Sequence, residues 1–132
     1  AFVELFLFIK ENIKKLKCIL ETTLASLAIE SWRLSKSFER LLIKSDPMEQ
    51  RKYKSKLSWF NKKLNETLEE ANLKFINLEN QKYDTGAAVT AINLDDFKPD
   101  DDLEIDQMIE PIVMSNEGVL RAGTVVLRKR LA

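Results

Sequence analysis

The feature that most constrains this chain is a stripe of apolar residues spaced three or four positions apart, in a stretch without glycine or proline. With one serine included, the stripe consists of Phe2, Phe6, Ile9, Ile13, Leu16, Leu20, Leu24, Leu27, Ser31, Leu34, Phe38 and Leu41. Alternating steps of four and three, with one extra step of four near Leu20, are typical of a coiled coil. At about 1.5 Å per residue, the stripe predicts a helix over residues 2–44 that is about 60 Å long.

A second helix is predicted over residues 47–71. Asp46 suits the N-cap, Pro47 suits the first helical position, and Glu49 stands where a capping box needs an acidic residue. The short connection makes the two helices antiparallel neighbours. The apolar stripe of the second helix consists of Tyr53, Leu57, Phe60, Leu64, Leu68 and Ala71.

The length of the first helix predicts self-association. The residues that follow it are too few to wrap a helix of this length, so a second copy is the simplest partner for its stripe. Two helical hairpins from two chains would form a four-helix bundle. We therefore predict a homodimer with an interface at Leu16, Leu20, Leu27, Leu34, Phe38, Leu57, Phe60 and Leu64.

The pattern changes after residue 72. Short β-prone runs occur at residues 73–78, 87–94, 103–114 and 119–128, and turn-rich pieces separate them. These runs predict a small antiparallel sheet of about four strands. The fold class is therefore α+β, with a helical dimerisation region at residues 1–72 and a β-rich domain at residues 73–132.

The composition argues against catalysis. The chain has no histidine and one cysteine, Cys18, so it lacks the commonest general base and the usual zinc ligand. Phosphate-loop, dinucleotide-binding and serine-nucleophile motifs are also missing from the sequence. We expect a protein that is not an enzyme and that uses no cofactor and no metal.

Charge is divided between the halves: 16 basic and 11 acidic residues stand up to Lys82, and 5 basic and 10 acidic residues follow. The acidic run at residues 95–106 lacks the central glycine of an EF-hand and contains Pro99, so we interpret it as a solvated loop, with weak Ca²⁺ binding left open. The basic run at residues 51–63 has its aromatic Tyr53 and Phe60 on the apolar stripe, so we expect no nucleic-acid partner.

Residues 2–9 form an apolar run interrupted by Glu4. This run is too short to span a bilayer and lacks the features of a secretory signal. We therefore expect no membrane partner and a cytoplasmic location. The alternative is that the run is the end of a longer membrane segment, followed on the cytoplasmic side by Lys10, Lys14, Lys15 and Lys17.

Several short pieces of the second half follow the order found in a known family. They are Leu68-Glu69-Glu70-Ala71-Asn72-Leu73-Lys74-Phe75, Tyr83-Asp84, Val89-Thr90-Ala91-Ile92 with Asp95-Asp96 and Pro99, and Val119-Leu120-Arg121-Ala122-Gly123-Thr124-Val125-Val126. In this order the chain, from about Trp32 onward, resembles the GrpE family of nucleotide exchange factors for DnaK-type chaperones. It departs from the family after Asp84, where the usual His-Glu-Ala is missing, and at Glu110-Pro111-Ile112, where the family has Gly-Tyr.

The resemblance implies a dimer that inserts one β unit into the nucleotide cleft of a chaperone's ATPase domain and so promotes ADP release. The residues expected to touch that partner are Asp84, Asp95, Asp96, Met108, Met114 and Arg121. Two alternatives stay open: the two methionines could fill the core, and Arg121 could pair with Asp95 or Asp96. The rival function is that of a coiled-coil adaptor whose β tail docks a different client protein.

Overall fold

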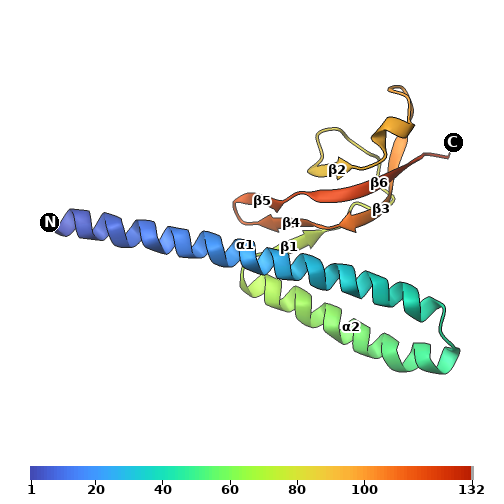
Figure 1. Ribbon diagram of the computed structural model, residues 1–132, viewed down its shortest axis with the longest axis horizontal. Coiled ribbons are helices and arrows are strands. Elements are labelled where there is room, and N and C mark those ends of the chain that lie inside the picture. The colour runs from blue at the N-terminus through green and yellow to red at the C-terminus, as the bar shows by residue number, and fades with distance from the viewer. Residues whose placement is uncertain (132) are drawn as a thin grey trace.

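Two helices form a hairpin in the computed structural model, which describes residues 1–131 (Figure 1). Helix α1 spans Phe2–Ile43 and helix α2 spans Pro47–Glu70, so the sequence prediction is confirmed to within one residue at each end. Asp46 caps α2, since its Oδ1 accepts from the N–H groups of Met48 at 3.0 Å and Glu49 at 3.1 Å. The side-chain amide of Gln50 closes the turn by donating to the carbonyl of Ser45 at 2.9 Å.

The buried residues of α1 lie outside the predicted stripe, although Phe38 of the stripe contacts α2. The buried residues of α1 are Ala25, Ala28, Ile29, Ser35 and Leu42. Ser35 Oγ donates to Asn61 Oδ1 at 2.6 Å, and the ring of Phe38 meets that of Tyr53 edge-on with centroids 6.2 Å apart. The small side chains of Ala25 and Ala28 allow the neighbouring elements to approach α1 closely. The N-terminal part of α1 extends past the end of α2 (Figure 1).

A β unit follows the hairpin. Its strands are β1 (Lys74–Ile76), β2 (Val89–Ala91), β3 (Leu103–Glu110), β4 (Ile112–Ser115), β5 (Gly118–Arg121) and β6 (Gly123–Lys129). Within residues 1–131 they form two three-stranded sheets with the orders β1-β4-β5 and β2-β6-β3. A 3-10 turn, η1 (Leu94–Asp96), begins the connection from β2 to β3.

The predicted sheet of about four antiparallel strands needs two corrections. Residues 103–114 divide into β3 and β4 at Pro111, which cannot donate to a ladder, and the chain passes there from one sheet to the other. Residues 119–128 divide in the same way into β5 and β6, which also lie in different sheets. In addition, β2 pairs with β6 in the parallel direction, with Thr90 opposite Thr124. The loop after η1 carries the chain from one edge of β6 to the other.

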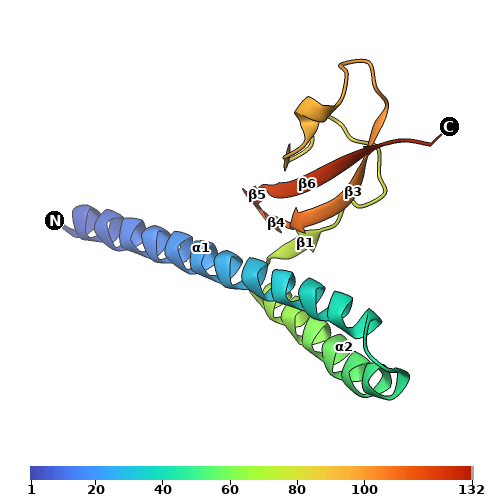
Figure 2. The same ribbon diagram turned by 45° about the vertical axis from the view of Figure 1, so that its right-hand side comes forward.

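The β unit lies against the helical hairpin (Figure 2), and two hydrophobic clusters fix it there. The first joins helices and strands through Ala25, Ala28, Ile29, Leu68, Leu73 and Val113. The second lies inside the β unit, where Trp32 of α1 packs against it. Asn72 turns the chain from α2 into β1 with a positive φ of 59°, and Leu73 donates its N–H to the carbonyl of Leu68 at 2.8 Å. This tight exit holds β1 close to the end of α2.

Candidate protein-binding surfaces

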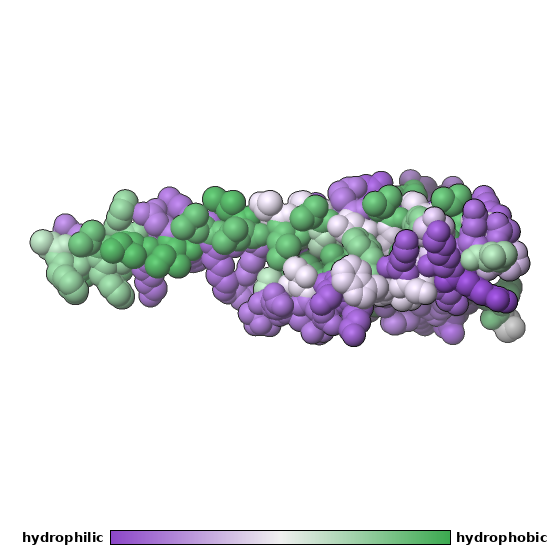
Figure 3. Space-filling model, turned by 90° about the horizontal axis from the view of Figure 1, so that it is seen from below, coloured by the Kyte–Doolittle hydropathy of each residue, from purple (hydrophilic) through white to green (hydrophobic). Residues whose placement is uncertain are grey.

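One side of α1 forms an uncovered apolar seam, which we define by Leu16, Leu20, Leu27 and Leu34. These four side chains are between 60% and 69% exposed. Figure 3 shows apolar residues gathered along α1 from its N-terminal end toward the hairpin. An uncovered apolar stripe of this length is unfavourable in water and is typical of a surface that binds another protein.

The seam continues into a groove between α1 and α2. The groove has a volume of about 240 Å³, and its lining includes Leu24, Leu27, Ser31, Phe60 and Leu64. Of these, Leu24 and Leu64 also pack against the buried cluster between helices and strands. The predicted interface residues therefore include the largely exposed seam residues and residues such as Leu64 that also hold the hairpin together.

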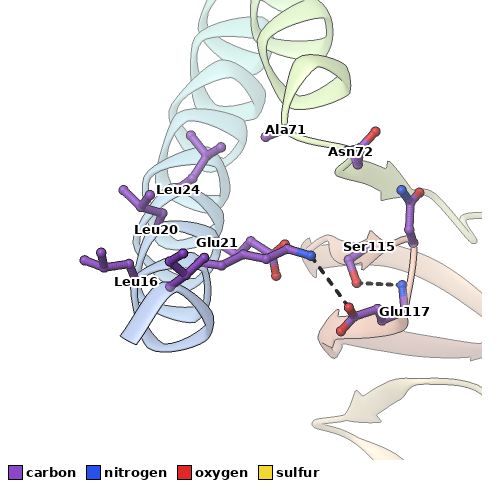
Figure 4. Close-up of a pocket in the computed structure, with 11 residues that line it drawn as sticks. Leu16, Leu20, Glu21, Leu24, Ala71, Asn72, Ser115 and Glu117 are labelled. Carbon is purple, nitrogen blue, oxygen red and sulfur yellow. Dashed lines mark hydrogen bonds and ion pairs between the residues drawn. The ribbon is translucent and has the colours of Figure 1, made fainter. Parts of the chain in front are cut away.

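A second cavity, of about 400 Å³, lies between α1 and the β4–β5 turn. Leu16, Leu20 and Leu24 line it from the helix, and Ser115 and Glu117 line it from the turn (Figure 4). The backbone N–H of Glu117 donates to Ser115 Oγ at 3.2 Å, and Lys17 Nζ lies 3.7 Å from Glu117 Oε1. Both charged side chains are well exposed, so this ion pair contributes little to stability.

The side chains of Met108 and Met114 pack in or against the core of the β unit. Met108 is 2% exposed and lies in the cluster inside the β unit, so the prediction of a partner contact is wrong for this residue. Its Sδ accepts from the N–H of Leu78 at 3.3 Å. Met114 is half-buried against the same cluster. The alternative of core filling therefore describes Met108 fully and Met114 in part.

Arg121 lies at the junction of the β unit with the helix. Its Nη1 donates to Ser26 Oγ of α1 at 3.0 Å. Asp95 and Asp96 lie in η1, on the side of the β unit away from α1 in both ribbon views (Figures 1 and 2). The structure thus separates Arg121 from the acidic pair and gives it a contact that joins helix to strand.

Asp84 shapes a turn. Its Oδ1 accepts from the N–H of Gly86 at 3.0 Å, and its carbonyl accepts from the N–H of Ala87 at 2.9 Å. This is the local pattern by which aspartate stabilises a turn. The side chain is exposed, so the turn presents its carboxylate to solvent ahead of β2.

Sequence reasoning named Asp95 and Asp96 as partner-binding residues but missed the exposed residues that precede them at the end of β2. We define the β2–η1 patch by Thr90, Ile92, Leu94, Asp95 and Asp96, all of which are exposed. Ile92 is 61% and Leu94 is 44% exposed. Strand β2 ends at Ala91 and η1 begins at Leu94, so the period of two that a strand shows does not extend over these residues and gave no signal for the patch.

Asn93 holds this segment in place from the opposite face. Its carboxamide makes two hydrogen bonds with the backbone of Leu127, each 2.9 Å long. The side chain therefore pins the chain just after β2 to strand β6, and it keeps the neighbouring Ile92 and Leu94 on the outer face.

The charged groups near β3 and β6 pair with one another. Arg128 Nε lies 2.6 Å from Glu104 Oε1, and Arg128 Nη1 lies 2.7 Å from Asp106 Oδ1. Hydrogen bonding to Glu104 is the main reason that the pKa of Arg128 is raised. In the acidic loop, Asp101 Oδ2 accepts from the N–H of Lys98 at 2.8 Å. Among residues 1–131, no group of three or more histidine, cysteine or acidic side chains is placed to hold a metal ion.

In comparison with known proteins, no protein-family model, curated protein or solved structure matches this chain. In the described part of the chain, no helix has both the length and the apolar character to cross a membrane.

Proposed function

We propose that this chain is a cochaperone that binds the ATPase domain of a DnaK-type chaperone and promotes ADP release. The observation that supports the proposal best is the β2–η1 patch, where exposed Ile92 and Leu94 lie beside exposed Asp95 and Asp96. In a protein interface, buried apolar side chains contribute affinity and neighbouring charges contribute selectivity. The layout also supports it, because a long helix, a helical hairpin and a small β unit follow in the order that the GrpE resemblance implies.

Dimerisation is part of this proposal. The seam of Leu16, Leu20, Leu27 and Leu34 continues into the groove lined by Phe60 and Leu64. A second copy would place its own leucines over this surface, as knobs fill holes in a coiled coil. The two hairpins would then form a four-helix bundle, with a β unit carried on each chain.

The proposed mechanism uses binding energy to change the partner's shape. A factor that binds the open form of an ATPase domain better than the closed form shifts the population toward the open form. ADP prefers the closed form, so the two ligands weaken each other's binding reciprocally. A coupling of about 1–3 kcal/mol would weaken ADP binding about 5- to 150-fold.

The test is the release of fluorescent ADP from the ATPase domain of a DnaK-type chaperone of the same organism. We expect the chain to accelerate release, and we expect the triple variant Ile92→Ser, Asp95→Asn, Asp96→Asn to lose most of that acceleration. A matched control is Val119→Ser, which removes an exposed apolar side chain of β5 outside the patch. Acceleration that survives the triple change would place the contact elsewhere on the β unit.

The exposed seam also fits the rival function of a coiled-coil adaptor. Nucleotide separates the two functions. A cochaperone should release the ATPase domain when ATP is added, whereas an adaptor should hold its client equally well with ATP, with ADP and without nucleotide. Failure to accelerate ADP release, with the dimer intact, would favour the adaptor.

A further inference from the structure

The N-terminal end of α1 is apolar on nearly every side. At 100° per residue, the seven apolar residues between positions 2 and 9 cover about 260° of the helix circumference, whereas the large apolar side chains between positions 10 and 20 lie within about 120°. Val3, Leu7 and Phe8 point away from the seam and are 66%, 56% and 63% exposed. We call these three residues the off-seam tip.

A second copy of α1 does not cover the off-seam tip. A paired helix covers one side of its partner, and the off-seam tip lies roughly 100° or more from the centre of the seam. These side chains would therefore stay in water in the proposed dimer. A helix that is apolar all round requires surroundings that enclose it completely, such as lipid.

Basic residues follow the tip at once. Lys10, Lys14 and Lys15 are exposed, and they lie on the sides of α1 away from the seam. Among residues 1–131, no carboxylate lies within ion-pair distance of these three lysines, whereas Lys17 lies 3.7 Å from Glu117 and 3.9 Å from Glu21. Three unpaired positive charges beside an apolar tip are complementary to an anionic lipid surface, where each lysine strengthens binding about fivefold.

We propose that the off-seam tip inserts into an anionic lipid surface, with Lys10, Lys14 and Lys15 at the level of the headgroups. Residues 2–9 are about 12 Å long, which is comparable to one leaflet of a hydrocarbon core about 30 Å thick. This departs from the sequence-based expectation of no membrane partner, because the pattern alone does not show that these side chains stay uncovered. The proposal is independent of the chaperone function.

The test is sedimentation of the whole chain with phosphatidylcholine vesicles that contain phosphatidylserine, and with vesicles of phosphatidylcholine alone. We expect strong binding to the first and weak binding to the second. Leu7→Ser with Phe8→Ser should weaken binding at least about tenfold, because two large side chains lose their lipid contact. The matched control is Ile43→Ser with Met48→Ser, which removes two exposed apolar side chains at the far end of the hairpin and should leave binding unchanged.

Charge is tested separately. Changing Lys10, Lys14 and Lys15 to Gln should weaken binding to the anionic vesicles about 100-fold, while the same change at Lys52, Lys54 and Lys56 of α2 should have little effect. Glu4 is the acidic residue within the apolar run, so Glu4→Gln should strengthen binding.

Several outcomes would overturn the proposal. One is an unmodified chain that stays in the supernatant with both vesicle types; another is equal weakening by the tip variant and its control. A third is an unmodified chain that forms oligomers larger than a dimer, binds no vesicles and loses those oligomers in the tip variant. The tip would then contact other copies of the chain. The ADP-release assay contains no vesicles, so failure of either proposal can be recognised without the other.

Discussion

The side chain of Asn93 replaces a strand partner for Leu127. Its Oδ1 accepts from the N–H of Leu127 and its Nδ2 donates to the carbonyl of the same residue, both at 2.9 Å. One residue earlier, Ile92 donates its backbone N–H to Val125 at 3.1 Å. Asn93 thus extends the pairing of β2 with β6 by a side chain and sets the direction in which the β2–η1 patch faces.

Asn93→Ala should destabilise the chain. The change leaves two half-buried backbone groups of β6 without their partner, which costs about 1–3 kcal/mol in the free energy of unfolding. Urea unfolding measures the loss. The control is Asn116→Ala in the exposed β4–β5 turn, which should change stability by less than about 0.5 kcal/mol. Equal stabilities of the two variants would show that the Asn93 bonds are dispensable.

Gly123 is the first residue of β6, where the chain passes from the sheet that contains β5 to the sheet that contains β6. A Cβ at this position would lie 2.9 Å from Met108 Cε, 3.0 Å from the Glu110 carbonyl oxygen and 3.0 Å from Ile112 Cγ1. Met108 can adjust, but a backbone carbonyl cannot, so Gly123→Ala should cost about 1–3 kcal/mol of stability.

Thermal unfolding of Gly123→Ala and of the matched variant Gly86→Ala checks this prediction. At Gly86 the nearest atom to an added Cβ is Asp84 Oδ1 at 3.6 Å, an ordinary contact. We therefore expect Gly86→Ala to unfold close to the unmodified chain. A Gly123→Ala variant with an unchanged melting temperature would mean that the bend between β5 and β6 is looser than the distances indicate.

The helices were predictable because their signals are local. Asp46 and Pro47 mark the start of α2 through neighbouring backbone groups, and the apolar spacing defines α1 without any tertiary information. The burial of Ala25 and Ala28 against α2 and the β unit was not predictable, because a search for large apolar residues overlooks small ones.

The β unit was less predictable because its geometry depends on distant pairing. Simple alternation from the buried Leu103 and Ile105 would place Met108 on the outer face, but a register irregularity between Ile105 and Gln107 turns it into the core. Arg121 contacts Ser26, 95 positions earlier in the chain, and no local pattern indicates such a contact. The apolar part of the β2–η1 patch was not predictable from strand alternation either, because β2 ends at Ala91 and the chain then turns into η1.

Arg128 should stabilise the β3–β6 pair in a salt-dependent manner. Its guanidinium bonds Glu104 at 2.6 Å and Asp106 at 2.7 Å on the surface, where dissolved ions screen charges. Arg128→Gln should therefore lower the urea midpoint in dilute buffer, and the difference from the unmodified chain should shrink in about 1 M salt. A difference that is independent of salt would assign the effect to lost packing of the aliphatic stem.

The pH dependence of this contribution follows from the raised pKa of Arg128, which hydrogen bonding to Glu104 causes first of all. A group whose pKa is raised on folding stabilises the folded chain at every pH below its unfolded value, and the contribution disappears only as the pH rises through the folded value. Both values are strongly alkaline for arginine. The difference between Arg128→Gln and the unmodified chain should therefore stay constant from neutral to mildly alkaline pH.

The seam should control the oligomeric state. Leu27 and Leu34 are exposed in the single chain, and Leu27 also lines the groove between α1 and α2. In the proposed dimer these side chains are buried, so Leu27→Lys with Leu34→Lys would place unpaired charges in an apolar interface at a cost of several kcal/mol. We expect monomers with unchanged helix content, measured by analytical ultracentrifugation and circular dichroism. The matched control, Ile92→Lys with Leu94→Lys, introduces the same charges on the β2–η1 patch and should remain dimeric, because that patch lies away from α1. A seam variant that still sediments as a dimer would contradict the pairing of the long helices and require a different surface for self-association.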